Sequence, residues 1–120
     1  MRLWEKLVSV AAIAVIVAGS NYAYEREALR DSLDARFHQI NKEYFDSQLS
    51  YVRVVWDYLP DAYGQSYSDG TIKIGTTTVT TGEKLEETLR HEACHQFVGV
   101  EHEHNEVWRS CMTRFSTESR

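Results

Sequence analysis

The spacing of apolar residues predicts a helix and then a strand in the first half of the chain. Between residues 25 and 45, apolar side chains recur every three or four positions, as on one face of an amphipathic α-helix. This face consists of Leu29, Leu33, Phe37, Ile40 and Tyr44. From residue 51 to residue 58 the period changes to two, which predicts a strand, and Pro60 closes it.

The segment that follows has the pattern of a β-hairpin. Two short stretches, 63–67 and 71–75, are joined through Asp69 and Gly70. An Asp-Gly pair favours a tight hairpin turn, because both residues tolerate positive φ angles. We therefore expect two neighbouring antiparallel strands here, with Ile72 and Ile74 on one face.

Two helices are predicted in the last third of the chain. The first covers 81–98: Thr80 and Glu83 have the spacing of a capping box, and Gly99 is placed to end the helix. Its expected buried face consists of Leu85, Leu89, Ala93 and Phe97. A last helix is expected over 105–115. The order helix, three strands, helix, helix predicts an α+β domain with a small, mainly antiparallel sheet.

The N-terminal segment 1–23 differs from the rest and sets a predicted boundary with a domain over 24–120. Arg2 and Lys6 precede the uncharged run 7–19, which has the length of a signal-peptide core and is shorter than the roughly 20 residues that span a bilayer. A cleaved signal, an uncleaved membrane anchor and a buried N-terminal helix are the three alternatives. The first two predict an exported (periplasmic or extracellular) or membrane-anchored protein, and the third a cytoplasmic one.

Composition limits the function classes. The 120 residues suffice for one compact domain, expected to be a monomer. With 13 basic and 18 acidic residues, the net charge of −5 is unlike that of proteins that hold nucleic acid by its phosphates. Cys94 and Cys111 are too few for a disulfide scaffold. They lie on consecutive predicted helices, where a disulfide is one alternative and two buried free thiols are the commoner outcome.

The segment from His91 to His95 carries the clearest chemical pattern, His-Glu-x-x-His. Four residues make just over one helical turn, so the two imidazoles project from the same face and can bind one Zn²⁺. Glu92 lies beside them and is not needed as a ligand. A carboxylate in this place can act as the general base that takes a proton from a zinc-activated water.

A third zinc ligand is expected soon after Gly99, where the chain can fold back over the metal. His102 and His104 are two residues apart, so we expect only one of them to bind the ion. The spacing His-x-x-Gly-x-x-His is excluded, because Val98 and Glu101 occupy the required positions. Whichever histidine is not the ligand is expected to be exposed or to lie just outside the metal's own ligands.

Between residues 37 and 115 the chain resembles the SprT-like (Spartan-type) zinc metallopeptidases. The segments that carry the resemblance, in order, are 41–49, Trp56, 70–74, 87–95 and 104–108. The last of these is similar to the family's closing His-Gly-x-x-Phe/Trp, which assigns the third ligand to His104. The resemblance implies a minimal zincin fold, one zinc ion held by His91, His95 and His104, and endopeptidase cleavage of a polypeptide with Glu92 as general base.

The sequence departs from the family at points that bear on partners. Asn105 stands where the family has glycine, and no zinc ribbon or basic tail follows the last predicted helix. Seven acidic residues against Lys84 and Arg90 lie between residues 83 and 106, which opposes nucleic-acid binding beside the site. A zinc-binding module without catalysis and a DNA-associated protease of the crosslink-repair type are the alternatives to a general peptidase.

Overall fold

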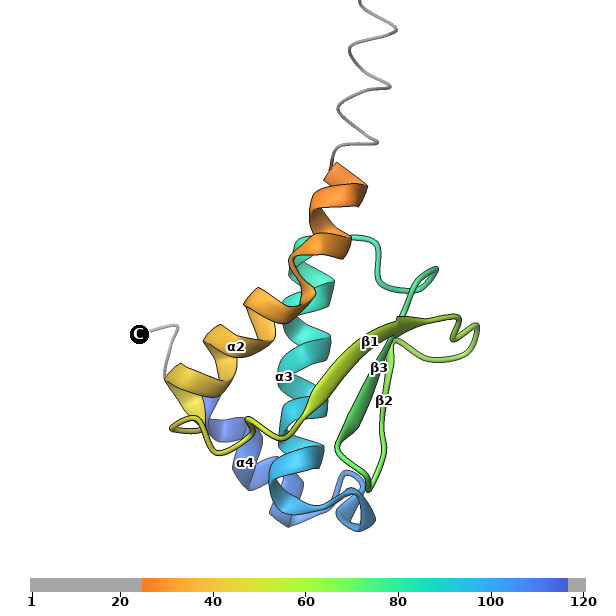
Figure 1. Ribbon diagram of the computed structural model, residues 1–120. Helices are drawn as coiled ribbons and strands as arrows, with labels where there is room; N and C mark the ends of the chain where they lie inside the picture. Colours follow the sequence, from red (N-terminus) through yellow and green to blue (C-terminus); the bar gives the residue numbers. More distant parts are fainter. Residues whose placement is uncertain (1–24, 117–120) are drawn as a thin grey trace, which may run out of the picture. The chain divides into compact units, whose positions relative to one another are not determined.

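The computed structural model describes residues 25–116 (Figure 1). The predicted signal peptide or anchor in 1–23 lies outside these described residues, so export and membrane association stay predictions. Among the described residues, no helix has the length and apolar character to cross a membrane. The helix expected over 25–45 is interrupted at Ser32: residues 25–31 are helical, and a separate compact unit begins at Ser32.

The unit from Ser32 onward has the predicted α+β composition and order of elements. Its elements are α2 (Leu33–Tyr44), β1 (Arg53–Asp57), β2 (Gly64–Ser66), β3 (Thr71–Gly75), α3 (Gly82–Val98), the 3₁₀ helix η1 (Val100–His102) and α4 (Glu106–Ser116). Helices α2 and α3 pack on one face of the sheet, and α4 packs against α3 (Figure 1). This arrangement is consistent with a minimal zincin fold.

The three strands form a mixed sheet in the order β1-β3-β2. The hairpin of β2 and β3 is antiparallel as predicted, but β1 pairs with β3 in parallel, so only one of the two pairings is antiparallel. Strand β3 takes the centre, and its two isoleucines, Ile72 and Ile74, are fully buried. Strand β2, with only Gly64, Gln65 and Ser66, takes one edge.

The register of the sheet decides which small residues face the helices. Val54, Ile72 and Ser66 lie in one cross-strand row, and Trp56, Ile74 and Gly64 lie in the next. Because alternate residues of a strand share a face, Gly64 and Ser66 point to the same side as the buried isoleucines, toward α3. Edge strand β2 therefore presents its two small residues, Gly64 and Ser66, to α3, the helix that carries the His-Glu-x-x-His motif.

Helix α3 is the central element of the fold, and Leu85, Leu89 and Ala93 on it are fully buried. The expected fourth member of this face, Phe97, is instead 39% exposed, because it lies in the last turn, where the helix leaves the core. The helix is capped one residue later than predicted: Thr81, not Thr80, accepts the hydrogen bond from the backbone N–H of Lys84.

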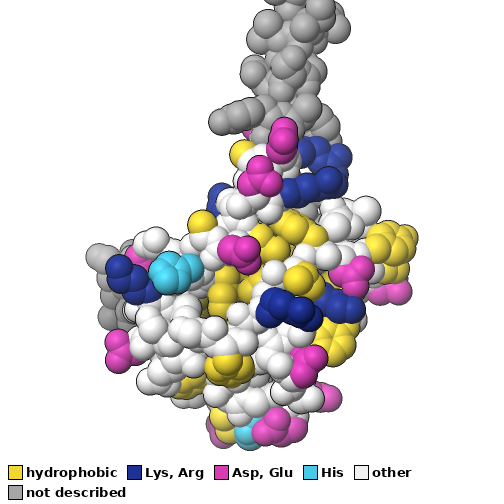
Figure 2. Space-filling view, viewed as in Figure 1, with side chains coloured by type: hydrophobic (Ala, Val, Ile, Leu, Met, Phe, Trp, Pro, Cys, Tyr) yellow, Lys and Arg dark blue, Asp and Glu magenta, His cyan; other side chains and the backbone are white. Residues whose placement is uncertain are grey.

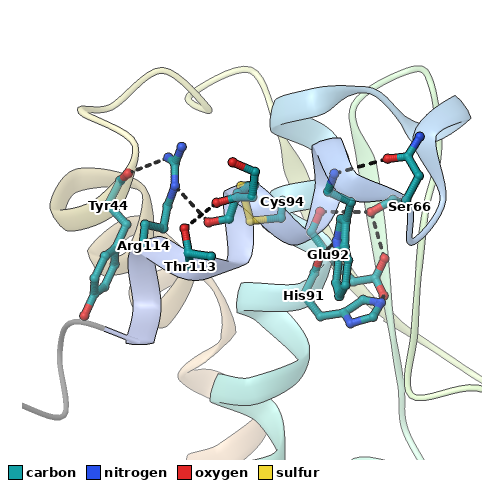
Figure 3. The surroundings of a disulfide bond; sticks show 11 residues. Tyr44, Ser66, His91, Glu92, Cys94, Thr113 and Arg114 are labelled. Atoms are coloured by element: carbon teal, nitrogen blue, oxygen red, sulfur yellow. Dashed lines mark hydrogen bonds and ion pairs between the residues drawn. A yellow bond between two sulfur atoms is a disulfide. The ribbon is translucent and has the colours of Figure 1, made fainter.

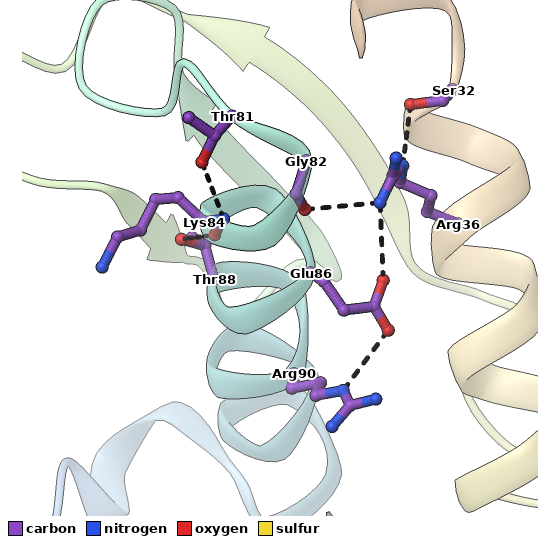
Figure 4. A network of polar contacts seen from close by, with 8 residues as sticks. All are labelled: Ser32, Arg36, Thr81, Gly82, Lys84, Glu86, Thr88 and Arg90. Carbon is purple, nitrogen blue, oxygen red and sulfur yellow. Dashed lines mark hydrogen bonds and ion pairs between the residues drawn. The ribbon is translucent and has the colours of Figure 1, made fainter.

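A polar network joins the N-terminal half of α3 to α2 (Figure 4). Arg36 donates to the hydroxyl of Ser32 at 3.0 Å and to the backbone carbonyl of Gly82 at 3.3 Å. Its guanidinium also lies 4.0 Å from the carboxylate of Glu86, which accepts a second contact from Arg90 at 3.3 Å. These contacts fix the start of α3, while the chemical motif lies in its second half.

Candidate metal centre

Three histidines converge at the C-terminal end of α3. His91 and His95 lie one helical turn apart on α3, and His104 reaches them from the segment between η1 and α4. The Nε2 atom of His91 lies 3.2 Å from that of His95 and 3.0 Å from that of His104. The three rings together offer ligand atoms that all lie within 4.8 Å of one another, the one such group among the described residues.

The geometry and protonation of this group fit a zinc ion. Nitrogen ligands at 2.0–2.1 Å from one tetrahedral ion lie roughly 3.3 Å apart, close to the two Nε2 separations of His91. A histidine must be neutral to bind a metal. Burial and the nearby rings of His95 and His104 lower the pKa of His91 to about 4. Burial and His104 also lower the pKa of His95.

The connection between α3 and α4 brings His104 back to the helix. Helix α3 ends at Gly99, whose φ of +104° is a conformation that side-chain-bearing residues rarely adopt. A second reversal follows at Glu103, which also has a positive φ, of +50°. Asn105, at the family's glycine position, then accepts hydrogen bonds from the backbone N–H groups of Val107 and Trp108 and so caps α4.

His102 lies outside the histidine group. Its Nδ1 atom is 3.2 Å from the side-chain amide of Asn105, and its Nε2 atom is 3.8 Å from the carboxylate of Glu101. The structure thus brings His104, rather than His102, together with His91 and His95. His102 is the last residue of η1 and precedes the reversal at Glu103, after which the chain brings His104 to the other two histidines.

The indole ring of Trp108 on α4 packs against all three histidine rings. Its ring centroid lies 4.7 Å from those of His91 and His104 and 5.3 Å from that of His95, on which it stacks. Its indole N–H also donates to the backbone carbonyl of His91 at 3.2 Å. The side chain of Trp108 is half-buried against all three rings.

A disulfide between Cys94 and Cys111 joins α3 to α4 beside the site. In Figure 3 it lies between the contact of Tyr44 with Arg114 on one side and His91 and Glu92 on the other. The expectation of two free thiols is therefore wrong. The two helices pack closely enough to bring the Cα atoms to 5.8 Å, a distance that suits a disulfide.

Glu92 points from α3 toward the sheet and is 5% exposed. Burial raises the pKa of its carboxyl to about 7, and a hydrogen bond from the Ser66 hydroxyl offsets part of this rise. One carboxylate oxygen, Oε1, accepts that bond at 2.9 Å, and the other, Oε2, lies 4.0 Å from Nε2 of His91. The carboxylate therefore lies next to the ligand atoms without joining their group.

The histidines and Glu92 line an open cleft of about 650 Å³. Its walls come from β2 and the residue after it, from α3, and from the connection to α4. The lining residues are Gly64, Gln65, Ser66, Tyr67, His91, Glu92, His95, Val100, Glu103 and His104. A cleft of this size, with titratable groups gathered at one end, is typical of a site that takes a ligand from solvent.

Comparison with known proteins agrees with this geometry. The model of the SprT-like family matches residues 33–120. The chain belongs to the SprT-like family. No curated protein and no solved structure matches it significantly. Family and geometry together describe a zinc-metallopeptidase-like domain with three histidines that can bind a metal ion.

One wall of the cleft of this SprT-like domain, the stretch from α3 to the start of α4, carries exposed acidic residues, and Glu103 lines the cleft itself. Glu101, Glu103 and Glu106 are all exposed on the connection between α3 and α4 and at the start of α4. Figure 2 shows acidic side chains beside a histidine at the end of the molecule where this connection lies. An exposed negative rim repels a polyanion and tolerates a neutral or basic polypeptide.

The sequence did not point to two residues of the site, Gly64 and Ser66. Both lie next to Glu92, although 26 residues separate Ser66 from it along the chain. Small residues in a three-residue strand carry no periodic signal, and only the pairing with β3 turns them toward α3. The sequence offered one indication: Gly64 and Ser66 are two positions apart, and residues two apart in a strand share a face.

Proposed function

We propose that this SprT-like domain is a zinc-dependent endopeptidase, with His91, His95 and His104 as metal ligands and Glu92 as general base. The observation that carries the proposal is the placement of the Glu92 carboxylate, 4.0 Å from a ligand nitrogen and inside the same open cleft. A metal site with no catalytic task has no need of a buried carboxylate beside its ligands, since burying a charged group is costly.

Glu92 and the three histidines have different roles in the proposed peptide hydrolysis. His91, His95 and His104 would hold a zinc ion, which would supply a Lewis acid for the scissile carbonyl and for the attacking water. Glu92 accepts the proton of the attacking water and donates it to the departing amine. His91, His95 and His104 provide the ring nitrogens for the metal, and Trp108 packs against all three rings.

The edge of the sheet gives the cleft a way to hold an extended chain. Strand β2 lies at the end of the sheet order and lines the cleft next to Glu92. Unpaired backbone groups at a sheet edge can pair with a peptide that adds as a further strand. This supports a polypeptide, rather than a small molecule, as the substrate.

The proposal is tested by cleavage of a reduced, carboxymethylated protein by the purified, zinc-loaded full chain. We expect Glu92→Gln to lower kcat by roughly 10² to 10⁴, the usual contribution of general acid–base catalysis, with the zinc content unchanged. Glu83→Gln is the matched control, because Glu83 is an exposed glutamate in the first turn of the same helix. Full activity of Glu92→Gln would overturn the proposal.

The same assay separates the two alternatives. Wild-type protein that binds zinc tightly but cleaves nothing would be a zinc-binding module. Cleavage that requires added single-stranded DNA would indicate a DNA-associated protease. We expect cleavage without DNA, because Glu103 lines the cleft and Glu101 and Glu106 are exposed on the same stretch of chain.

We also propose that the domain works outside the reducing cytoplasm. The observation in favour is the Cys94–Cys111 disulfide, since disulfides persist in oxidising compartments and are rare in the cytosol. Alkylation of the protein in intact cells, before and after reduction, tests this. Two alkylated cysteines without any prior reduction would contradict an oxidising location.

A further inference from the structure

The edge strand β2 contacts helix α3 at Glu92, the residue that the proposed function assigns as general base. The inward-facing residues of β2 are Gly64 and Ser66, in register with Ile74 and Ile72. Both lie against the side chain of Glu92.

The hydroxyl of Ser66 lies between two acceptors that belong to the same residue. It donates to the backbone carbonyl of Glu92 at 3.1 Å and to Oε1 of its carboxylate at 2.9 Å (Figure 3). A hydroxyl has one proton to donate, which the two oxygens share. The hydrogen bond to the backbone carbonyl holds the Ser66 hydroxyl against helix α3. Because the hydroxyl is held there, its second hydrogen bond, to Oε1, limits the orientation of the Glu92 carboxylate.

The second carboxylate oxygen is left facing the histidines. Oε2 lies 4.0 Å from Nε2 of His91, the ring atom that also approaches His95 and His104. With Oε1 held by Ser66, any orientation that turns the carboxylate away from Ser66 loses this hydrogen bond to a charged group. The other oxygen, Oε2, is thereby kept on the side of the histidine group.

Gly64 makes this approach of strand and helix possible. A Cβ atom at position 64 would lie 2.9 Å from Cγ2 of Thr88, 3.0 Å from Cγ of Glu92 and 3.1 Å from its Oε2. Any larger residue would push β2 away from α3 or displace the carboxylate. The absence of a side chain at position 64 therefore lets the next inward residue, Ser66, come within hydrogen-bond distance.

We propose that Ser66 is a positioning residue for Glu92: it binds Oε1 and directs Oε2, the oxygen that exchanges the proton, toward the histidine group. The proposal rests on the proposed function, in which Glu92 is the general base. It predicts that the hydroxyl of Ser66 affects turnover through Glu92 and leaves metal binding alone, because this hydroxyl hydrogen-bonds to Glu92 and the proposed ligands are His91, His95 and His104.

The test compares Ser66→Ala with Ser66→Thr and with Ser68→Ala in the zinc-loaded full chain. Ser68 is an exposed serine of the same hairpin outside the cleft and serves as the matched control. We expect Ser66→Ala to lower kcat about 10- to 100-fold, the usual cost of losing a partner of a metal-site group, with KM and zinc affinity within about twofold. Ser66→Thr keeps the hydroxyl and is expected to keep most of kcat.

A double-mutant cycle shows whether Ser66 acts through Glu92. In Glu92→Asp the shorter side chain withdraws the carboxylate from Ser66, so adding Ser66→Ala is expected to change kcat less than twofold. An equal loss of kcat in both backgrounds would overturn the proposal. So would a loss in Ser66→Thr as large as in Ser66→Ala, since the hydroxyl would then be irrelevant.

A readout independent of activity keeps this proposal apart from the proposed function. The carboxyl ¹³C resonance of Glu92 in metal-free protein, assigned by its absence in Glu92→Gln, is expected to move in Ser66→Ala and to stay in Ser68→Ala. An unmoved resonance would refute the contact. If the wild type cleaves nothing, the proposed function fails, and the resonance still decides whether Ser66 holds the carboxylate.

Discussion

At the residue scale, the candidate site depends on which histidine completes the group. Nitrogen ligands of one tetrahedral zinc ion lie about 3.3 Å apart, so a third ligand must bring its ring nitrogen close to those of His91 and His95. His104 meets this condition at 3.0 Å from His91, while His102 is held by Asn105 at 3.2 Å. The two histidines are chemically alike, so their different positions in the loop decide that His104, and not His102, joins the group.

We predict that His104→Ala weakens zinc binding by more than 100-fold. Loss of an outer partner of a metal ligand typically costs 10- to 100-fold in affinity, and loss of one of three ligands costs more. Competition with a chromophoric chelator at fixed pH measures the dissociation constant. His102→Ala is the matched control and is expected to stay within about threefold of wild type. Equal losses in both variants would contradict the assignment of His104.

The residues of the motif itself were predictable because their spacing carries the chemistry. His91 and His95 had to share a helix face, and Glu92 had to lie beside them. The sequence left His102 and His104 open until the family resemblance favoured His104, because a loop with positive φ at Gly99 and Glu103 has no periodicity to extrapolate. Ser66 could not be found, since its contact with Glu92 depends on strand pairing.

At the element scale, the start of α4 fixes both Trp108 and the residue next to His104. Asn105 accepts from the backbone N–H of Val107 at 3.1 Å and of Trp108 at 3.3 Å, so it satisfies two groups that a helix start leaves without partners. The same first turn of α4 places the indole ring of Trp108 against the three histidine rings. The cap therefore links helix stability to the back wall of the site.

We predict that Asn105→Ala lowers the free energy of unfolding by about 1 kcal/mol, as expected for the loss of an N-cap. Urea unfolding of the metal-free protein measures this change. Asn105→Asp, which keeps an acceptor oxygen in the same place, is expected to retain the stability of wild type. Asn105→Gly, the residue typical of the family, is expected to cost only a few tenths. An Asn105→Ala protein as stable as wild type would refute the cap.

The elements were predicted better than their pairing. Amphipathic periodicity located α2, α3 and α4, and the Asp69-Gly70 turn located the β2–β3 hairpin. The parallel pairing of β1 with β3 was missed, because local patterns cannot show which strand takes the centre of a sheet. Burial decides that question: the strand with Ile72 and Ile74 is covered on both edges, and the polar strand β2 is left beside the cleft.

At the scale of the whole molecule, α4 is held to the rest by few elements. It packs against α3, and Phe115 near its end is buried against the rings of Tyr44 and Phe45. Between these contacts lies the Cys94–Cys111 disulfide, which closes a loop of 17 residues that contains the whole connection carrying His104. The disulfide thus restricts the unfolded chain and keeps Trp108 beside the ligands in the folded one.

We predict that reduction lowers the free energy of unfolding by about 3 kcal/mol, the chain-entropy value for a closed loop of this length. Urea unfolding of the metal-free protein with and without a phosphine reductant measures the difference, with equilibration long enough to reduce the buried sulfurs. The double variant Cys94→Ala/Cys111→Ala is the matched control, because it has no disulfide to lose and should not respond to the reductant. Since the loop carries His104, reduced wild-type protein is also expected to bind zinc more weakly than oxidised protein. Equal urea midpoints for the two wild-type samples would show that the crosslink does not stabilise the fold.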